Sequence, residues 1–375
     1  MSTDKQITRR RMLQSATTGA SGAIAATLFR QSAHGASVLA DAGGAPDPRI
    51  QGPFLILSTP FTASGAVDFD ALAREACYVD WCGCPGMIWP QSGDNVDLLT
   101  TDEKLQGMEV LAKTARKLST TALCLGVQGK DTAEMLLFAE HVEKLAPPAL
   151  ISRPPDSGKT EDDLRRYWQA LAAVTKRPVF IQTTGGVAYK GPIPSVELLV
   201  ELAKAFPNFG YVKEEAGNVI ARTRALLAAK PPIRRVFSAR GGFGWLYELR
   251  LGSEGLITER AIYADVLTRI WQLHQSGSDP AALRDAYSKF LLMLNLNKTH
   301  PGSDLRGIQL YLWKKRGVFQ TTVSRHYGPG GTIPKSPIYS DLALSQEEIA
   351  EIEYRFEALR PYQKPGSPDF AAAVQ

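Results

Sequence analysis

The sequence lacks several features that would assign a function at once. It has four cysteines and five histidines in 375 residues. The histidines show no spacing typical of metal ligands, and the cysteines offer no second ligand pair of the zinc-finger kind, so we expect no metal site. Neither the glycine pattern of dinucleotide-binding proteins nor the Walker pattern is present. Nucleotide cofactors that bind through these two motifs are therefore not expected.

The chain also has no large excess of charge of either sign. There are 43 Lys and Arg against 38 Asp and Glu, and the formal net charge is +5. Five basic and two acidic residues fall within residues 1–42, so the rest of the chain is nearly balanced. No basic run is interleaved with aromatics, and we expect no nucleic-acid partner. Beyond residue 42 no apolar run reaches the ~18 residues of a membrane helix, which predicts no span in the mature chain.

The N-terminal 42 residues resemble a targeting segment. Arg9-Arg10-Arg11-Met12 resembles the twin-arginine export consensus, and a weakly apolar stretch follows at 16–29. That stretch is too short and too polar for a membrane span. Ala40-Asp41-Ala42 offers a small-x-small cleavage site, and Ala33 to Ala36 is an alternative. We therefore predict a signal peptide at residues 1–42, the twin-arginine export machinery as a partner, and a periplasmic mature protein. The alternative is an N-terminal extension with chance arginines.

The four cysteines are Cys77, Cys82, Cys84 and Cys124. An oxidising compartment permits disulfides. Cys82 and Cys84 are too close in sequence for an easy mutual bridge, so a disulfide would join Cys77 to one of them. The alternative, which we favour, is buried free thiols around the end of one helix.

Past a Gly- and Pro-rich linker at 43–51, short apolar runs alternate with longer amphipathic stretches. Strands are expected at 54–57, 86–89, 122–127, 149–151, 178–181, 209–213, 235–238 and 255–258. Helices are expected between and after them, at 68–81, 101–118, 131–145, 161–175, 195–205, 218–229, 245–251 and 261–275. This strict alternation indicates a closed parallel (β/α)8 barrel rather than an open doubly wound sheet.

We place the barrel at residues 52–275. Further helices are expected at 280–294, 305–315 and 346–359. Residues 276–375 would therefore form a C-terminal helical extension with a tail.

The most distinctive segment is Tyr211-Val212-Lys213-Glu214-Glu215, at the end of the sixth expected strand. Side chains alternate along a strand, so Tyr211 and Lys213 should both point into the barrel. Lys213 lies at the end where barrel enzymes place catalysis. Burial without an obvious charged partner would favour the neutral amine, which attacks a ketone to form an imine. The alternative is a lysine that reaches solvent or pairs with Glu214 or Glu215.

Several motifs resemble the dihydrodipicolinate synthase/N-acetylneuraminate lyase family of Schiff-base aldolases and dehydratases. The matching residues are Thr59-Pro60-Phe61 with Gly65 and Asp68, Leu99-Thr100 with Asp102-Glu103, Val212-Lys213-Glu214 with Gly217-Asn218, and Gly252 with Gly255. The resemblance runs from about residue 52 to about residue 361. It implies a (β/α)8 barrel in which Lys213 forms a Schiff base with a 2-keto acid. No external cofactor is then expected, because the protonated imine is itself the electron sink.

The resemblance also places a carboxylate-binding loop before Leu99-Thr100. The family usually has Gly-Thr-Thr-Gly-Glu there, whereas this chain has Pro-Gln-Ser-Gly-Asp-Asn. In an ungapped count Ser92 and Gly93 replace the two threonines, and we expect them to hold the substrate carboxylate. One insertion would instead align Gly93-Asp94 with Gly-Glu, and the alternative is an ordinary turn.

Two further substrate-binding candidates lie at the ends of later strands. Gly241 belongs to a glycine-rich loop after the seventh strand, where backbone N–H groups could bind an anion. Close packing beside the imine is the alternative for that loop. Thr258 ends the eighth strand.

The fifth strand departs most from the family pattern. The family usually has Tyr-Asn-x-Pro there, with a tyrosine that relays protons, whereas Gln182 stands at that position here. The family arginine that follows has no counterpart. Glutamine is no general acid near pH 7, but it can hold a water or a hydroxyl. In this respect the chain resembles a branch of the family that acts as 2-keto-3-deoxy sugar-acid dehydratases, some of which carry glutamine at this position. We expect Gln182 and Tyr211 to orient or relay protons, although Tyr211 could be a packing aromatic.

These residues predict a lyase that dehydrates or cleaves a 2-keto-3-deoxy sugar acid, with Lys213, Gln182 and Tyr211 as catalytic residues. Two alternatives stay open. One is a condensation of pyruvate with an aldehyde, as in dihydrodipicolinate synthases. The other is a non-catalytic exported barrel that binds a keto acid. The resemblance is also compatible with a homo-oligomer.

Overall fold

The computed structural model describes residues 47–296, 305–368 and 370. The predicted signal peptide at 1–42 and residues 43–46 of the predicted linker lie outside the described residues. None of the helices in the described part of the chain has the length and apolarity needed to cross a membrane.

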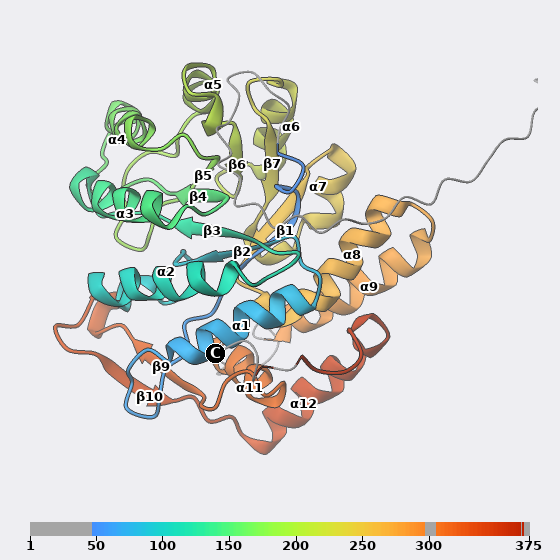
Figure 1. The fold of residues 1–375 in the computed structure, drawn as a ribbon. Helices are drawn as coiled ribbons and strands as arrows, with labels where there is room; N and C mark the ends of the chain where they lie inside the picture. The colour runs from blue at the N-terminus through green and yellow to red at the C-terminus, as the bar shows by residue number, and fades with distance from the viewer. Residues whose placement is uncertain (1–46, 297–304, 369, 371–375) are drawn as a thin grey trace, which may run out of the picture. The chain divides into compact units, whose positions relative to one another are not determined.

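Eight parallel strands close into a barrel in the order β1 to β8, and β8 pairs back onto β1 (Figure 1). The strands are β1 (Gly52–Ile56), β2 (Gly86–Trp89), β3 (Ala122–Gly126), β4 (Ala149–Ser152), β5 (Val179–Gln182), β6 (Tyr211–Lys213), β7 (Arg235–Ser238) and β8 (Gly255–Thr258). The helices between and after them are α1 (Phe69–Trp81), α2 (Thr101–Ala115), α3 (Thr132–Leu145), α4 (Glu161–Val174), α5 (Val196–Ala205), α6 (Val219–Ala228), α7 (Trp245–Leu251) and α8 (Ala264–Ser276). The predicted (β/α)8 barrel is confirmed.

Side-chain caps fix where the barrel helices begin. The Asp68 carboxylate accepts the N–H of Ala71 at 2.9 Å and so begins α1. Thr100 and Glu103 form a reciprocal capping box at the start of α2. Such caps satisfy N–H groups that have no partner inside the helix. They also fix the loops that precede the helices they cap, and these loops surround the C-terminal end of the barrel.

Aromatic rings fill the deeper part of the barrel interior. The ring of Phe180 lies 5.4 Å from Phe54, 5.0 Å from Phe237 and 5.6 Å from Tyr211, measured between centroids. A Cβ on Gly86 would lie 2.3 Å from the Phe54 ring, so only glycine leaves room for that ring. Apolar side chains occupy this layer, and the polar residues Ser152, Gln182, Lys213, Ser238 and Thr258 lie at the C-terminal ends of their strands.

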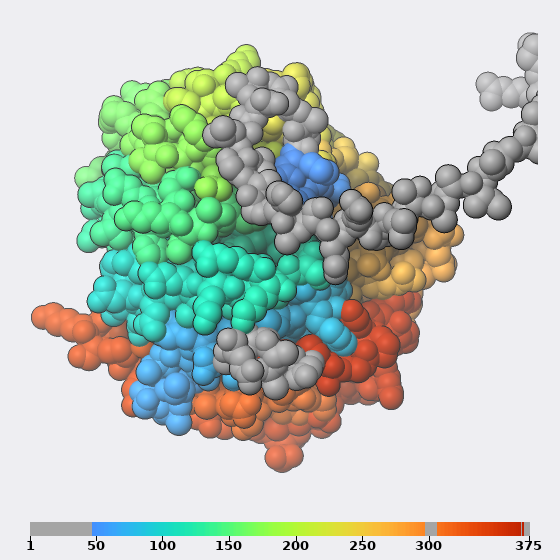
Figure 2. Space-filling view, in the orientation of Figure 1, coloured from blue at the N-terminus to red at the C-terminus, as the bar shows by residue number. Residues whose placement is uncertain are grey.

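The C-terminal extension consists of α9 (Pro280–Leu294), α11 (Leu305–Lys315), α12 (Gln346–Glu357) and an antiparallel hairpin of β9 (Val323–His326) and β10 (Ile338–Asp341). The three helices agree with the prediction, whereas the hairpin was not predicted. Its strands are mostly polar and β10 is exposed along its whole length, so no apolar run or strict alternation indicates them. Figure 2 shows this orange segment beside the blue and cyan surface of α1 and α2.

All four cysteines are free thiols in the structure. Cys82, Cys84 and Cys124 are buried, and Cys77 is half-buried. Burial raises the pKa of Cys77 to about 11 and that of Cys84 to about 12. The thiols are therefore kept in their neutral, unreactive form.

Candidate functional site

Lys213 ends β6 and lines a cavity of about 330 Å³ at the C-terminal end of the barrel. Its side chain is only 5% exposed. The ammonium Nζ donates to Gln182 Oε1 at 3.0 Å and lies 3.4 Å from Glu215 Oε1. The register of β5 and β6 explains the first contact, because it pairs Gln182 with Lys213. The expectation that Lys213 has no charged partner is wrong, since Glu215 pairs with it.

Gln182 is buried, and every polar position of its amide is occupied. Its Oε1 accepts from Lys213 Nζ and from Gln91 Nε2, both at 3.0 Å. Its Nε2 donates to the carbonyl of Thr184 at 2.9 Å and to the hydroxyl of Thr184 at 3.1 Å. An amide has two acceptor and two donor positions. Gln182 therefore orients the amine, and it has no position left for the water that we expected it to hold.

Glu215 is predicted from the sequence only as a possible ion-pair partner of Lys213 and not as a site residue, yet it lines the cavity. Its carboxylate accepts the hydroxyl of Thr184 and lies beside Lys213. The neighbouring Glu214 is fully buried and accepts from Arg222 Nε at 3.1 Å. One acid thus anchors the loop after β6, and the other acid is available for proton transfer. The spacing of two residues from Lys213 is the sequence signal that could have indicated Glu215.

Tyr211 does not reach the cavity. It points into the barrel as predicted, but it lies beside Phe180 in the aromatic layer, two residues and about 7 Å deeper than Lys213. Its hydroxyl accepts the backbone N–H of Asp47 at 3.3 Å, ahead of the N-terminus of β1. Burial raises the pKa of its phenol. The predicted relay role of Tyr211 is wrong, because its hydroxyl lies toward the opposite end of the barrel.

Thr258 is fully buried and is not among the residues that line the cavity. Its hydroxyl donates to Glu259 Oε2 at 3.2 Å. Glu259 itself lines the cavity. The predicted contact of Thr258 with substrate is therefore replaced by an indirect one, in which Thr258 positions a neighbouring carboxylate.

Ser92 and Gly93 line the same cavity as Lys213. Ser92 Oγ accepts from Arg153 Nη1 at 2.5 Å, and Arg153 Nη2 pairs with Asp97 at 2.8 Å. Arg153 follows β4 and is 5% exposed. A Cβ on Gly186, after β5, would lie 2.4 Å from Arg153 Nη2. The arginine that the loop after β5 lacks is thus supplied beside Ser92 from the end of β4.

The C-terminal extension holds the loop that carries Ser92 and Gly93. Asp94 Oδ1 accepts from Arg306 Nη1 at 2.9 Å. Asn95 Nδ2 donates to Ser324 Oγ at 3.0 Å and to the Arg325 carbonyl at 3.1 Å. The geometry of this loop therefore depends on the extension as well as on the barrel.

The side of the cavity next to β7 and β8 carries several charges. Arg240 has a φ of +53° and donates to the carbonyls of Glu215 at 2.8 Å and Gly217 at 3.1 Å. Glu259 pairs with Arg260 at 3.2 Å. Burial acts to raise the pKa of Glu259, but the charges of Arg260 and Lys213 help to lower it overall. Glu259 is therefore an ionised partner of the cations around it.

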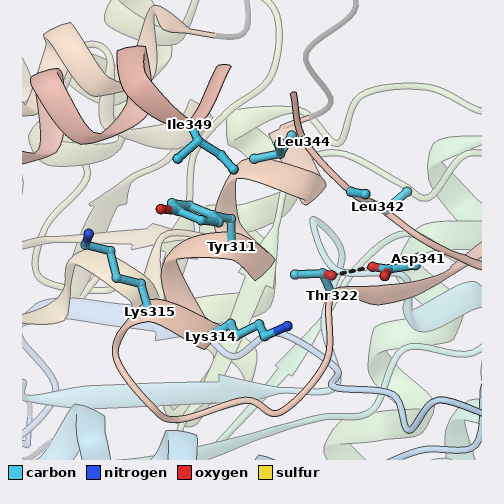
Figure 3. A pocket seen from close by; sticks show the side chains of 9 residues that line it. Tyr311, Lys314, Lys315, Thr322, Asp341, Leu342, Leu344 and Ile349 are labelled. Atoms are coloured by element: carbon cyan, nitrogen blue, oxygen red, sulfur yellow. Dashed lines mark hydrogen bonds between the residues drawn. The ribbon is translucent and has the colours of Figure 1, made fainter. Parts of the chain in front are cut away.

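A second cavity, of about 440 Å³, lies in the C-terminal extension (Figure 3). Tyr311, Leu344 and Ile349 form its apolar wall, and Lys315 pairs with Glu353 at 2.5 Å. No buried lysine meets an acid there as Lys213 does. In the described part of the chain, no three His, Cys, Asp or Glu side chains are grouped to hold a metal ion. The Lys213 cavity is therefore the candidate active site.

Sequence comparison finds relatives named 4-hydroxy-tetrahydrodipicolinate synthase. It is 24% identical to the 4-hydroxy-tetrahydrodipicolinate synthase of Chlorobium phaeobacteroides over 256 residues, 68% of this chain and 84% of that protein. It is 27% identical to the Rhizobium meliloti protein of the same name over 208 residues, 52% of this chain and 68% of that protein. No family model matches the chain.

Solved structures show the same fold. Dihydrodipicolinate synthase from Rhodopseudomonas palustris superposes with a TM-score of 0.68 and 18% identity, covering 84% of this chain and 99% of that one. N-acetylneuraminate lyase from Fusobacterium nucleatum gives a TM-score of 0.67 and 18% identity, covering 84% of this chain and all of that one. These similarities in sequence and fold support membership of the dihydrodipicolinate synthase/N-acetylneuraminate lyase family. The chain has Lys213 at the end of β6 and Gln182 at the end of β5.

Proposed function

We propose that this protein is a lyase that joins Lys213 to a 2-keto acid as a Schiff base and dehydrates or cleaves a 2-keto-3-deoxy sugar acid. The observation that carries the proposal is the position of the Lys213 amine. It is buried in a cavity between an amide oxygen at 3.0 Å and a carboxylate oxygen at 3.4 Å. The amide can orient a nucleophile, and the carboxylate can accept its proton.

The first step is formation of the imine. Glu215 accepts a proton from the Lys213 ammonium, and the neutral amine attacks the C2 ketone of the substrate. The resulting carbinolamine loses its hydroxyl as water, with a proton returned from Glu215, and leaves a protonated imine. Ser92 and Gly93 would hold the substrate carboxylate, with Arg153 polarising the Ser92 hydroxyl from 2.5 Å.

The second step needs one group that first removes a proton from C3 and then protonates the leaving C4 hydroxyl on the same side of the substrate. Glu215 would remove a proton from C3, and the electron pair would form an enamine with the imine carbon. The enamine then expels the C4 hydroxyl, which leaves as water with the proton from Glu215. Hydrolysis of the unsaturated imine restores Lys213. A single carboxylate beside the amine is sufficient for this sequence, so no phenol is required.

Dehydration is favoured over condensation by what surrounds the amine. In the family the condensing enzymes use a relay tyrosine and an arginine after the fifth strand. Here Gln182 stands at the first position, and the arginine comes from β4. Export to the periplasm, which we also propose, supports the same choice, because synthesis of an amino acid uses cytoplasmic substrates.

Borohydride trapping tests the proposal on purified mature protein. With a 2-keto acid present, the reduced adduct should map to Lys213 alone, and Lys213→Ala should abolish both the adduct and turnover. Lys104→Ala is the matched control, because Lys104 is a partly buried lysine in a neighbouring cavity and should leave the adduct in place. Turnover that persists in Lys213→Ala would rule out the Schiff base. An adduct without turnover on any keto-deoxy acid would identify a binding protein.

A comparison of kcat/KM separates dehydration from condensation. We expect activity on 2-keto-3-deoxy acids and almost none with pyruvate plus aspartate semialdehyde, because a missing positioned proton donor costs about 10²–10⁴ in rate. Higher kcat/KM with the condensation substrates would show that this reading of Gln182 is wrong.

A further inference from the structure

The Lys213 cavity contains a cation that the imine chemistry does not use. Arg260 follows β8, lines the cavity and is only 4% exposed. Its Nη2 pairs with Glu259 Oε1 at 3.2 Å. Its Nε and Nη1 have no hydrogen-bond partner among the residues that the structure describes. A buried guanidinium keeps its charge, so donors left unfilled in this way indicate a ligand that accepts hydrogen bonds.

The loop after β7 is shaped around this guanidinium. A Cβ on Gly241 would lie 3.3 Å from Arg260 Nη2, and Gly241 has a φ of +68°. Its neighbours Arg240 and Gly242 also have positive φ values, of +53° and +89°. Consecutive residues of this kind can turn backbone N–H groups toward one point, and the loops after strands 7 and 8 of such barrels often hold anions. Arg260 and the Gly241 loop lie together at this place.

The charges around the cavity also favour a second anion. Three cations line it, Lys213, Arg240 and Arg260, against two acids, Glu215 and Glu259. The carboxylate next to the keto group is assigned to the Ser92 and Gly93 loop, where Arg153 reinforces it. Arg260 is a further cation of this cavity; it pairs with Glu259, whose side chain also lies next to Gly93. It is therefore available to a different part of the substrate.

We propose that Arg260 and the Gly241 loop form a second anion subsite. The substrate would then be a 2-keto acid that carries another anionic group, a carboxylate or a phosphate, at its far end. This inference rests on the proposed function for the keto-acid end of the substrate. It narrows the substrate class from 2-keto-3-deoxy sugar acids in general to keto-deoxy diacids or phosphorylated keto-deoxy acids.

Matched keto acids test the subsite through borohydride trapping at Lys213. The pairs are 2-oxoglutarate with 2-oxopentanoate and 2-oxoadipate with 2-oxohexanoate, in which a terminal carboxylate replaces a methyl group at two chain lengths. A third ligand, 2-oxo-4-phosphonobutanoate, distinguishes a phosphate preference from a carboxylate preference. We expect half-maximal trapping at a concentration at least about tenfold lower for one of the anionic ligands than for its neutral counterpart.

The variant Arg260→Gln should reduce that preference to less than threefold. Arg316→Gln is the matched control, because Arg316 is also buried, paired with one carboxylate and left with an unpartnered Nε, but it lies outside the cavity. It should keep the wild-type preference. Equal trapping of anionic and neutral ligands by the wild-type protein would overturn the subsite, and so would a preference that survives in Arg260→Gln.

A binding measurement tests the subsite without the imine. Calorimetric titration should show tighter binding of glutarate or adipate than of pentanoate, and Arg260→Gln should remove the difference. If no keto acid is trapped at Lys213 but this difference is present, the proposed reaction fails and the subsite stands. If trapping occurs but neither measurement distinguishes the anionic ligands, the reaction stands and the subsite is overturned.

Discussion

At the scale of single residues, the departure from the usual family pattern lies in the side chains that surround the lysine. Gln182 uses all its hydrogen-bonding positions to hold Lys213, Gln91 and Thr184, which leaves acid–base chemistry to another group. In the proposed reaction Glu215 is that group, since its carboxylate lies 3.4 Å from the amine and accepts the Thr184 hydroxyl. The orienting and proton-transferring roles are thus divided between two neighbouring strand ends.

Glu215→Gln tests this division. The amide keeps the size of the side chain but cannot accept and return a proton, so kcat should fall by about 10²–10⁴. Borohydride should still give the Lys213 adduct, although more slowly, because the amine itself is unchanged. Thr184→Val should have a smaller effect, since it removes a hydrogen bond to Glu215 and leaves the acid in place. Wild-type turnover in Glu215→Gln would show that the proton is moved by a different group.

At the scale of elements, strand register and side-chain alternation make part of the site predictable. The end of β6 places Lys213 in the cavity, and the paired end of β5 places Gln182 beside it. Side-chain alternation correctly predicts that Tyr211 points into the barrel. It does not give the depth of Tyr211 below the cavity, and this depth determines which groups its hydroxyl can contact. The two-residue offset puts Tyr211 in the layer of Phe180, where its hydroxyl finds the backbone of Asp47.

Contacts between loops of non-adjacent strands could not be predicted in the same way. Arg153 follows β4 but reaches Ser92 after β2, and this pairing depends on the path of the loops rather than on any local pattern. The same holds for Asn95, which is held by the hairpin residues Ser324 and Arg325 more than 200 positions later. Single-sequence periodicity carries no information on such contacts.

Asn95→Ala tests whether the hairpin positions the substrate loop. The change removes two hydrogen bonds, to Ser324 Oγ and the Arg325 carbonyl, and should lower the free energy of unfolding by about 1–3 kcal/mol. A loosened loop should also raise KM several-fold, with a smaller change in kcat, because Ser92 and Gly93 would hold the carboxylate less well. Denaturant unfolding and steady-state kinetics measure the two effects.

Asn208→Ala is the matched control for that variant. Asn208 also donates two hydrogen bonds to backbone carbonyls, those of Thr175 and Arg177. These residues precede β5 and lie outside the Lys213 cavity. The control should lose similar stability with an unchanged KM. If KM rises equally in both variants, the effect is one of general stability and not of the loop.

At the scale of the whole molecule, the C-terminal extension and the barrel together surround the Lys213 cavity. α11 supplies Gln309, whose Nε2 donates to the Glu259 carbonyl at 2.8 Å, and Arg306, which holds Asp94. The extension thus secures the loops after both β2 and β8, on two sides of the cavity. The expected export of the protein fits this arrangement, because twin-arginine export carries proteins that are already folded.

The free thiols are compatible with the proposed location. Cys82, Cys84 and Cys124 are buried, and burial raises the pKa of Cys84 to about 12 and that of Cys77 to about 11. Thiol oxidation proceeds through the thiolate, which these positions suppress. Free cysteines of this kind are compatible with an oxidising compartment. Alkylation after denaturation without a reductant should accordingly label all four.

Export itself is predicted from Arg9 and Arg10 and from the small residues at 40–42. Protein purified from the native cell should lie in the periplasmic fraction and should begin after Ala36 or Ala42 by intact mass. Arg9→Lys combined with Arg10→Lys should keep the full-length chain in the cytoplasm, because the pair is the recognised feature of the signal. Arg30→Lys is the matched control, since it makes the same change in the same segment but outside the pair, and it should be exported normally.

Wild-type protein that stays in the cytoplasm with its first 42 residues attached would contradict the prediction, and so would a double-lysine variant that still reaches the periplasm. Either result would mean that the location of the protein no longer favours dehydration over condensation. The choice between these two reactions would then depend on Gln182 and Glu215 alone.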